Sequence, residues 1–460
     1  MKRETILYLF EPSSMEAFLE GKSTPVYSHD LNLMQLAQSA INLGVRVYIA
    51  NFHDSEKVYS VQSMWPTVNL QSSFSSNAIN KRLTFTFSAN HIAFLKKNRN
   101  KTRNRNVLIQ AAIHPIEDPS LFYPAGISSY INVVRNQIDF FVTQNSRMKD
   151  LLFRLLSLVA GYEDSNRIML SKLVPRVKDQ SHKEANRIKF RKQISIDSND
   201  ILFVNAGGAW SWTLFHEFIN AFTKVVADFP EKKIYFFQPA LGQEMNSSHL
   251  EYNKKTLQIL SELSETQKSR IIVGDGWDVN GNLISEMLDA ADYGISFSKE
   301  SLEHWQSYRV RILEYLAHGV PIITSRGSFW DDENTGTGFI FAGHHDNDLY
   351  NVISDVIQSH NPELILQRKT DLDRLLQQLT LQNQGERLIS ELVKHPLRHQ
   401  KPKVNNSPIW DFRDFAEPKR IGVRRLFKRT YYKIVNNPYA HELLVILGVR
   451  RFVRFLRKIR

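Results

Sequence analysis

The side chains best suited to chemistry form a short polar stripe, Arg309, Arg311 and Glu314, which is followed by Gly319. Two guanidinium groups suit the oxygens of a diphosphate, and a carboxylate accepts hydrogen bonds from hydroxyl groups. On a helix, Arg311 and Glu314 share one face with Ser307, because they stand four and seven residues after it. Two interpretations follow: an Arg–Glu pair on a solvated face, or a stripe that binds a charged, hydroxyl-bearing ligand.

The neighbouring elements favour the binding interpretation. Ser307 is expected to cap the start of a helix, and Gly319 is expected to end it in the left-handed conformation. The apolar runs 293–297 and 320–324 flank this helix and predict buried parallel strands. Open sheets of this type bind ligands outside the carboxyl ends of their strands, beside helix N-termini. Ser307 and Tyr308 therefore join the candidate binding residues.

Two glycine turns also follow predicted strands. Gly207 and Gly208 stand between the strand 201–204 and a helix, where backbone N–H groups can approach a phosphate, and Trp210 comes next. Gly276 and Trp277 follow the strand 270–273 and are candidates to border a nucleotide base. A tight structural turn and a packing role for Trp277 are the alternatives. Neither turn has a dinucleotide or P-loop motif.

Strands and helices alternate in both halves of the chain, which predicts an α/β protein with two doubly wound domains that face a cleft. We expect an N-terminal Rossmann-like domain over residues 1–178 and a second Rossmann-like domain over 201–360. The polar, basic segment 179–200 is predicted as a linker and 361–400 as a helical return segment. Residues 401–460 are predicted as a basic amphipathic tail.

Composition limits the function classes. The sequence has 460 residues and no cysteine, which excludes disulfides and thiolate chemistry. Its formal net charge of +12 comes entirely from residues 418–460, which hold 13 Lys and Arg against one acidic residue, so the rest is neutral. The apolar run near the N-terminus is too short for a signal peptide, and no apolar run is long enough to span a membrane.

His114 is a candidate catalytic residue, because it lies just beyond the predicted strand 107–112 and therefore at a strand end. A structural histidine is the alternative. No spaced set of His, Asp and Glu predicts a metal site, and His344, His345 and Asp346 are interpreted as a polar turn. We expect no cofactor and no metal.

Several segments resemble the GT-B glycosyltransferases, in particular the large retaining group called glycosyltransferase family 4. They are FVNAGGAWSW, IIVGDGWD, LDAADYGISFS and, most specifically, YRVRILEYLAHGVPIITSRG, with a looser resemblance in LAQSAINLGVRVYIA and DFFVTQNSRMKDLL. The resemblance covers both halves and stops near residue 395. It implies a nucleotide-sugar donor site in the second half and an acceptor site in the first.

The resemblance also implies roles for single residues. Glu314 matches the glutamate that binds the donor ribose. The family has another glutamate eight positions earlier, but Gln306 stands there, so this sequence departs from the Glu-x7-Glu motif and we expect Glu303 to take that role near the sugar. The arginine and lysine that usually follow the glycine turn are absent, and we expect Arg309 and Arg311 to contact the diphosphate. His114 would lie on the acceptor side.

The basic tail predicts a location. Arginine and lysine interleave with apolar residues there, as in segments that lie on an anionic membrane surface. The expected membrane contacts are Arg424, Arg425, Lys428, Arg429, Arg451 and Arg454. Nucleic-acid binding is the alternative, but the neutral body offers no further basic surface for it. We expect a cytoplasmic protein at the inner face of the membrane.

The sequence therefore predicts a hexosyltransferase that moves a sugar from a nucleotide-diphosphate sugar to a glycan or lipid-linked acceptor. Surface polysaccharide or glycolipid biosynthesis is the expected setting, and retention of the anomeric configuration follows from the resemblance. Two alternatives stay open: a nucleotide-sugar epimerase of the same fold, and a catalytically silent homologue that binds glycans or partners.

Overall fold

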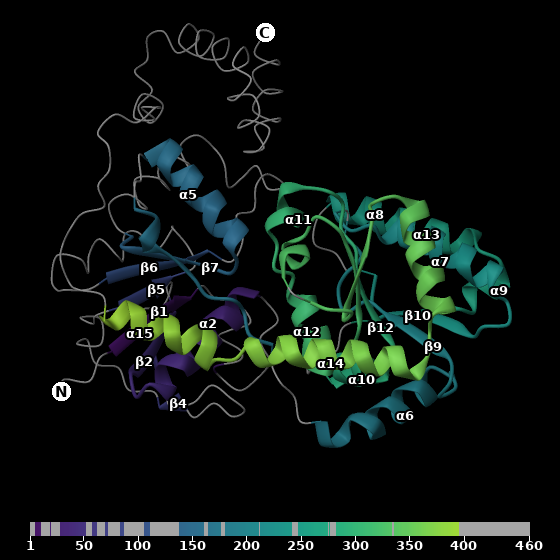
Figure 1. Ribbon diagram of the computed structural model, residues 1–460, viewed down its shortest axis with the longest axis horizontal. Coiled ribbons are helices and arrows are strands. Elements are labelled where there is room, and N and C mark those ends of the chain that lie inside the picture. The colour runs from purple at the N-terminus through teal and green to yellow at the C-terminus, as the bar shows by residue number, and fades with distance from the viewer. Residues whose placement is uncertain are drawn as a thin grey trace, which may run out of the picture. The chain divides into compact units, whose positions relative to one another are not determined.

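The computed structural model divides into two compact units (Figure 1). Described residues of 5–19, 29–172 and 385–394 belong to the first unit, and Ser28 and those of 173–384 belong to the second. The described residues are 5–10, 19, 28–51, 58–61, 70–71, 83–86, 105–110, 138–160, 164–175, 180–210, 212–241, 247–274, 276, 282–333 and 335–394.

The first unit is built on an eight-stranded sheet in the order β4-β3-β2-β1-β5-β6-β7-β8. Six strands run parallel, as predicted, whereas β3 and β4 add an antiparallel edge. The strands are β1 (Thr5–Phe10), β2 (Arg46–Asn51), β3 (Val58–Val61), β4 (Leu70–Gln71), β5 (Leu83–Thr86), β6 (Arg105–Gln110), β7 (Phe140–Thr143) and β8 (Ile168–Leu170).

Helices α2 (Ser28–Asn42), α5 (Ser146–Ala160) and α15 (Arg387–Lys394) complete the described part of the first unit. The last of these comes from the far end of the described chain, and its Leu388, Ile389 and Leu392 are at most 1% exposed within the core of this unit. The π-helical turn Gln382–Glu386 leads into α15. A Cβ atom at Gly385 would lie 2.0 Å from the Ser39 Oγ atom, so this close contact requires glycine.

The second unit has a six-stranded, fully parallel sheet in the order β11-β10-β9-β12-β13-β14. Counted along the chain within the unit, this order is 3-2-1-4-5-6, the doubly wound pattern. The order reverses between β9 and β12, which places the topological switch point there. The strands are β9 (Ile201–Val204), β10 (Ile234–Gln238), β11 (Ile271–Val273), β12 (Tyr293–Ser296), β13 (Ile322–Ser325) and β14 (Phe339–Ala342).

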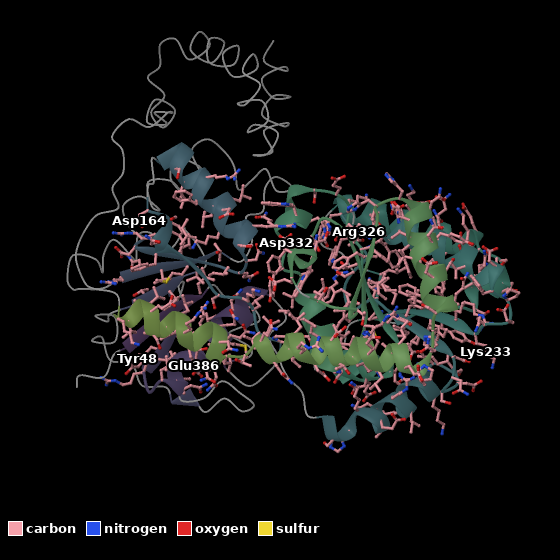
Figure 2. The ribbon with its side chains drawn as sticks, in the orientation of Figure 1. Tyr48, Asp164, Lys233, Arg326, Asp332 and Glu386 are labelled. Carbon is pink, nitrogen blue, oxygen red and sulfur yellow. The ribbon has the colours of Figure 1, made fainter. Side chains whose placement is uncertain are left out.

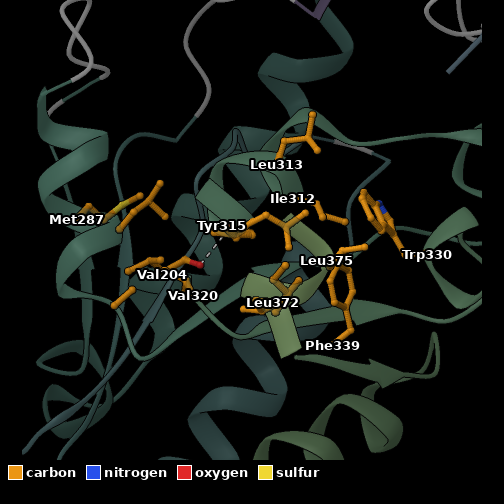
Figure 3. Packing of buried hydrophobic residues seen from close by; sticks show 14 of the residues in the cluster. Val204, Met287, Ile312, Leu313, Tyr315, Val320, Trp330, Phe339, Leu372 and Leu375 are labelled. Atoms are coloured by element: carbon orange, nitrogen blue, oxygen red, sulfur yellow. Dashed lines mark hydrogen bonds between the residues drawn. The ribbon is translucent and has the colours of Figure 1, made fainter. Parts of the chain in front are cut away.

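Helices cover both faces of this sheet, because its strands are apolar on both sides. One core lies under α7 and α13. The other lies under α10, α12 and α14 (Figure 3). The helices of this unit are α6 (Lys183–Gln193), α7 (Phe215–Asp228), α8 (Ser247–Glu262), α9 (Glu265–Lys268), α10 (Asn282–Ala290), α11 (Leu302–Gln306), α12 (Val310–His318), α13 (Asp346–Gln358) and α14 (Pro362–Gln378).

The segment 179–200, which we predicted as a linker, contains helix α6 and belongs to the second unit. Its charged residues explain the error, because they are paired within the fold. Arg191 is 3% exposed, and its Nη2 atom donates to the Ala290 carbonyl at 2.9 Å and to Asp292 Oδ2 at 2.6 Å. In the sequence, a buried guanidinium with such hydrogen bonds cannot be distinguished from a solvent-exposed one.

Candidate functional site

Tyr315 joins the two strands at the switch point. Its hydroxyl accepts the Ala206 N–H at 2.8 Å and donates to the Ile295 carbonyl at 2.7 Å, and it lies 3.3 Å from the Val204 carbonyl (Figure 3). Burial raises the pKa of Tyr315 to about 12, so the phenol stays neutral and remains a donor at physiological pH. The carboxyl ends of β9 and β12 are therefore fixed relative to each other.

Helix α12 begins beside this junction, and its start differs from the prediction. Its N-cap is Arg309, with φ of 50° and ψ of 98°, whereas Ser307 is the C-cap of α11. A non-glycine residue with positive φ is strained, by about 1–3 kcal/mol, and persists only where its surroundings hold it. The C-terminal prediction is confirmed, because Gly319 caps the helix with φ of 62°.

The neighbouring residue Tyr308 holds Arg309 in this strained conformation. It is 2% exposed, its hydroxyl donates to the Leu173 carbonyl at 3.3 Å, and its own carbonyl accepts from Trp330 Nε1 at 3.1 Å. The Tyr308 side chain is therefore a core residue in this structure. This corrects its expected place among the binding residues, and it explains how the strained turn at Arg309 is maintained.

The turn after β9 contacts α12 through Arg311. The guanidinium donates from Nη1 to Asn205 Oδ1 at 3.0 Å, and a Cβ atom at Gly207 would lie 2.3 Å from the Arg311 Cζ atom. Arg311 thus lies directly against the Gly207 backbone. At Gly208, a Cβ atom would lie 2.6 Å from the Trp210 indole, which stacks on Trp212 at 5.3 Å. Both glycines permit a side chain to pack on the backbone.

Glu314 is partly buried on the same face of α12, and it makes no hydrogen bond or ion pair with any residue that the structure describes. The Arg311 guanidinium donates to Asn205 instead, so the interpretation of these residues as a paired, solvated stripe is wrong. A carboxylate in this state keeps its acceptor capacity for a ligand.

The other predicted residues are placed only in part. A Cβ atom at Gly276 would lie more than 4 Å from every described residue that is not adjacent to it in the chain. The backbone of Glu303 is in α11, but its side chain lies outside the description. Outside the described residues lie His114, Trp277 and the six tail residues, Arg424, Arg425, Lys428, Arg429, Arg451 and Arg454. Gln306, at the position of the missing glutamate, is 0% exposed.

Two residues at the site were not predicted, Asn205 and Gln238. They are 3% and 0% exposed, and each follows or ends a buried strand at the same edge of the sheet. The Gln238 Nε2 atom donates to the Gly207 carbonyl at 2.8 Å and to the Ala240 carbonyl at 2.7 Å. The sequence did contain a signal for these two residues. Each is a polar residue at the end of an apolar strand, and a buried amide there requires hydrogen-bond partners.

The arrangement suits an anion with attached hydroxyl groups. A guanidinium, glycine backbone and a helix N-terminus without a side-chain cap meet at one strand end, and a carboxylate follows one turn later. Within the described part of the chain, no three His, Asp or Glu side chains group as a metal site would require. The arrangement can therefore hold a diphosphate and a diol.

No protein-family model and no curated protein matches the sequence. Solved structures do match, and similarity at such low identity concerns the fold. Anabaena Alr3699/HepE in complex with UDP matches with a TM-score of 0.60 and 13% identity over 85% of this chain and 99% of that one. The chain has the GT-B fold.

Other GT-B structures agree. A glycosyltransferase from Rickettsia africae ESF-5 matches with a TM-score of 0.56 and 12% identity over 86% of this chain and all of that one. The E. coli trehalose-6-phosphate structure bound with UDP-2-fluoro glucose has a TM-score of 0.60 and 9% identity over 85% and 99%. Among the described helices of this GT-B chain, none has the length and apolar character to cross a membrane.

Proposed function

We propose that the chain is a glycosyltransferase that transfers a sugar from a nucleoside-diphosphate sugar to a glycan or lipid-linked acceptor, in surface polysaccharide or glycolipid assembly. One observation carries the proposal: Arg311 lies against Gly207 at the switch point of the second sheet, one turn before a partly buried Glu314 that makes no hydrogen bond or ion pair with the described residues. Support comes from similar folds solved with UDP or UDP-glucose.

The proposed chemistry follows from charge. Negative charge develops on the diphosphate as the bond to the sugar breaks, and preorganised positive groups stabilise it. Arg311, Arg309 and the N-terminus of α12 are assigned to the diphosphate, and Glu314 accepts hydrogen bonds from the ribose hydroxyls. Glu303 is assigned to the sugar and His114 to the acceptor. Retention of configuration is part of the proposal and is tested by the anomeric form of the product.

Titration of UDP tests the donor site. Glu314→Ala is expected to weaken UDP binding at least tenfold, because a hydrogen bond to a charged group contributes about 1.5–3 kcal/mol. Isothermal titration calorimetry provides the measurement, and Glu231→Ala, an exposed glutamate of the same unit, is the matched control. Equal UDP affinity in the two variants would remove Glu314 from the site and leave the proposal without its ribose contact.

A catalytically silent homologue is the second candidate. Gln306 favours it, because this fully buried glutamine stands where the resembled family has a glutamate, so the position offers no carboxylate. Turnover decides between the two. The enzyme is expected to hydrolyse at least one nucleotide sugar slowly when no acceptor is present, detected as released UDP or GDP. Binding of a donor without any hydrolysis or transfer would support the silent homologue.

The membrane location is a separate proposal that rests on the sequence of residues 418–460 alone. Each Lys or Arg near an anionic surface contributes about 1 kcal/mol to binding. The full chain is expected to sediment with phosphatidylserine vesicles at low salt, and a chain without residues 418–460 is expected to stay in the supernatant. Vesicle binding by the truncated chain would contradict the proposal.

A further inference from the structure

Gln238 has an orientation that its surroundings dictate. It is 0% exposed, and its Nε2 atom donates to two backbone carbonyls, those of Gly207 and Ala240, at 2.8 and 2.7 Å. A carboxamide has one donor end and one acceptor end. Because both carbonyls accept hydrogen bonds, the nitrogen must face them, and the Oε1 atom must point the other way.

That orientation sets the next side chain. The Gln238 Oε1 atom accepts from Asn205 Nδ2 at 2.7 Å, so the nitrogen of Asn205 faces Gln238. The Asn205 Oδ1 atom is then directed away from Gln238, where it accepts from Arg311 Nη1 at 3.0 Å. Each amide is buried, and reversing either one would place two donors or two acceptors face to face.

We propose that Gln238 and Asn205 are positioning residues that form a two-amide relay, which holds the Arg311 guanidinium against Gly207 for contact with the donor diphosphate. The relay rests on the proposed function, because it acts through the diphosphate contact of Arg311. It runs from the end of β10 through the end of β9 to the first turn of α12. Residues of β10, the turn after β9 and α12 together fix the position of the Arg311 guanidinium.

Neutral amides suit this task better than a carboxylate. An aspartate at position 205 would pair with Arg311 and offset part of the charge that the diphosphate requires. An amide oxygen directs the guanidinium through one hydrogen bond and leaves its net charge intact. It also leaves the remaining guanidinium N–H groups to be directed by other contacts, including those of a bound phosphate.

A double-mutant cycle on UDP affinity tests the relay. Gln238→Met and Asn205→Ala each remove one member, and each is measured alone and together with Arg311→Met by calorimetry. With Arg311 present, each is expected to weaken UDP binding about tenfold. In the Arg311→Met background the same changes are expected to alter affinity less than twofold, because the group they position is gone. Gln258→Met, at an exposed glutamine of α8, is the control.

The outcomes separate the relay from the donor site. Equal weakening with and without Arg311 would show a structural role only and overturn the relay, and so would unchanged affinity in Gln238→Met or Asn205→Ala. If Arg311→Met itself left UDP affinity unchanged, the proposed donor site would fail. Near-ultraviolet circular dichroism checks folding, and if Gln238→Met does not fold, Asn205→Ala, which leaves the Gln238 contacts to both carbonyls in place, completes the cycle.

Discussion

Replacing Gly207 with alanine is expected to lower donor turnover by about a hundredfold or more, the usual effect of losing one charge-stabilising contact. The added Cβ atom would lie 2.3 Å from the Arg311 Cζ atom, so the guanidinium must move. It is the far end of a flexible side chain, and the φ of Gly207 is not positive, so stability should change little. The measurement is kcat/KM for hydrolysis of UDP-glucose, with the melting temperature recorded in parallel.

Gly44→Ala is the control for this change. Gly44 lies between α2 and β2 in the first unit, and its φ of 70° strains an alanine. This variant should lose some stability but keep the turnover of the unmodified chain. If Gly207→Ala retained full turnover, the position of Arg311 against the glycine backbone would have no part in catalysis.

Replacing Trp330 with alanine is expected to have the largest effect on stability. Trp330 is 1% exposed, packs on Tyr308 and Phe339 with ring centroids 4.9 and 5.2 Å away, and donates to the Tyr308 carbonyl. Removing a buried tryptophan costs about 3–5 kcal/mol, through lost burial and the cavity left behind. Urea unfolding followed by circular dichroism measures the loss.

Trp305→Ala provides the comparison, because that tryptophan is 37% exposed and its removal should cost less than about 1 kcal/mol. The buried change should also reduce UDP affinity, since Trp330 and Leu173 together hold Tyr308 and thereby the strained residue Arg309. Equal stability of the two variants would mean that the core around Tyr308 repacks without a cavity.

Local patterns predicted most of the elements that position the site. The predicted strand 201–204 matches β9 residue for residue, because burial on both faces leaves a continuous apolar run in the sequence. The predicted N-terminus of α12 differs from the observed one. Ser307 is a good capping residue, but the burial of Tyr308 and its bond to Trp330 place the helix start at Val310. Tertiary packing overrode local preference there.

The candidate site shows the same limit of local patterns. Residue types and positions near strand ends named Arg311, Glu314 and Gly207, and the structure places Arg311 against Gly207. Ligand contact by these residues stays a prediction. Asn205 and Gln238 were missed because they pair with each other across 33 residues of the chain, and their other partners are backbone carbonyls and Arg311. Hydrogen bonds of this kind depend on the order of strands in the sheet, and one sequence gives no direct signal for that order.

Helix α15 has a consequence for how the protein is made. Leu388, Ile389 and Leu392 close the core of the first unit, although the rest of that core is synthesised before residue 173. During translation the first unit must therefore wait, with an open apolar surface, until the whole second unit has left the ribosome. A nascent chain that stalls before residue 385 therefore presents an incomplete core to chaperones and proteases.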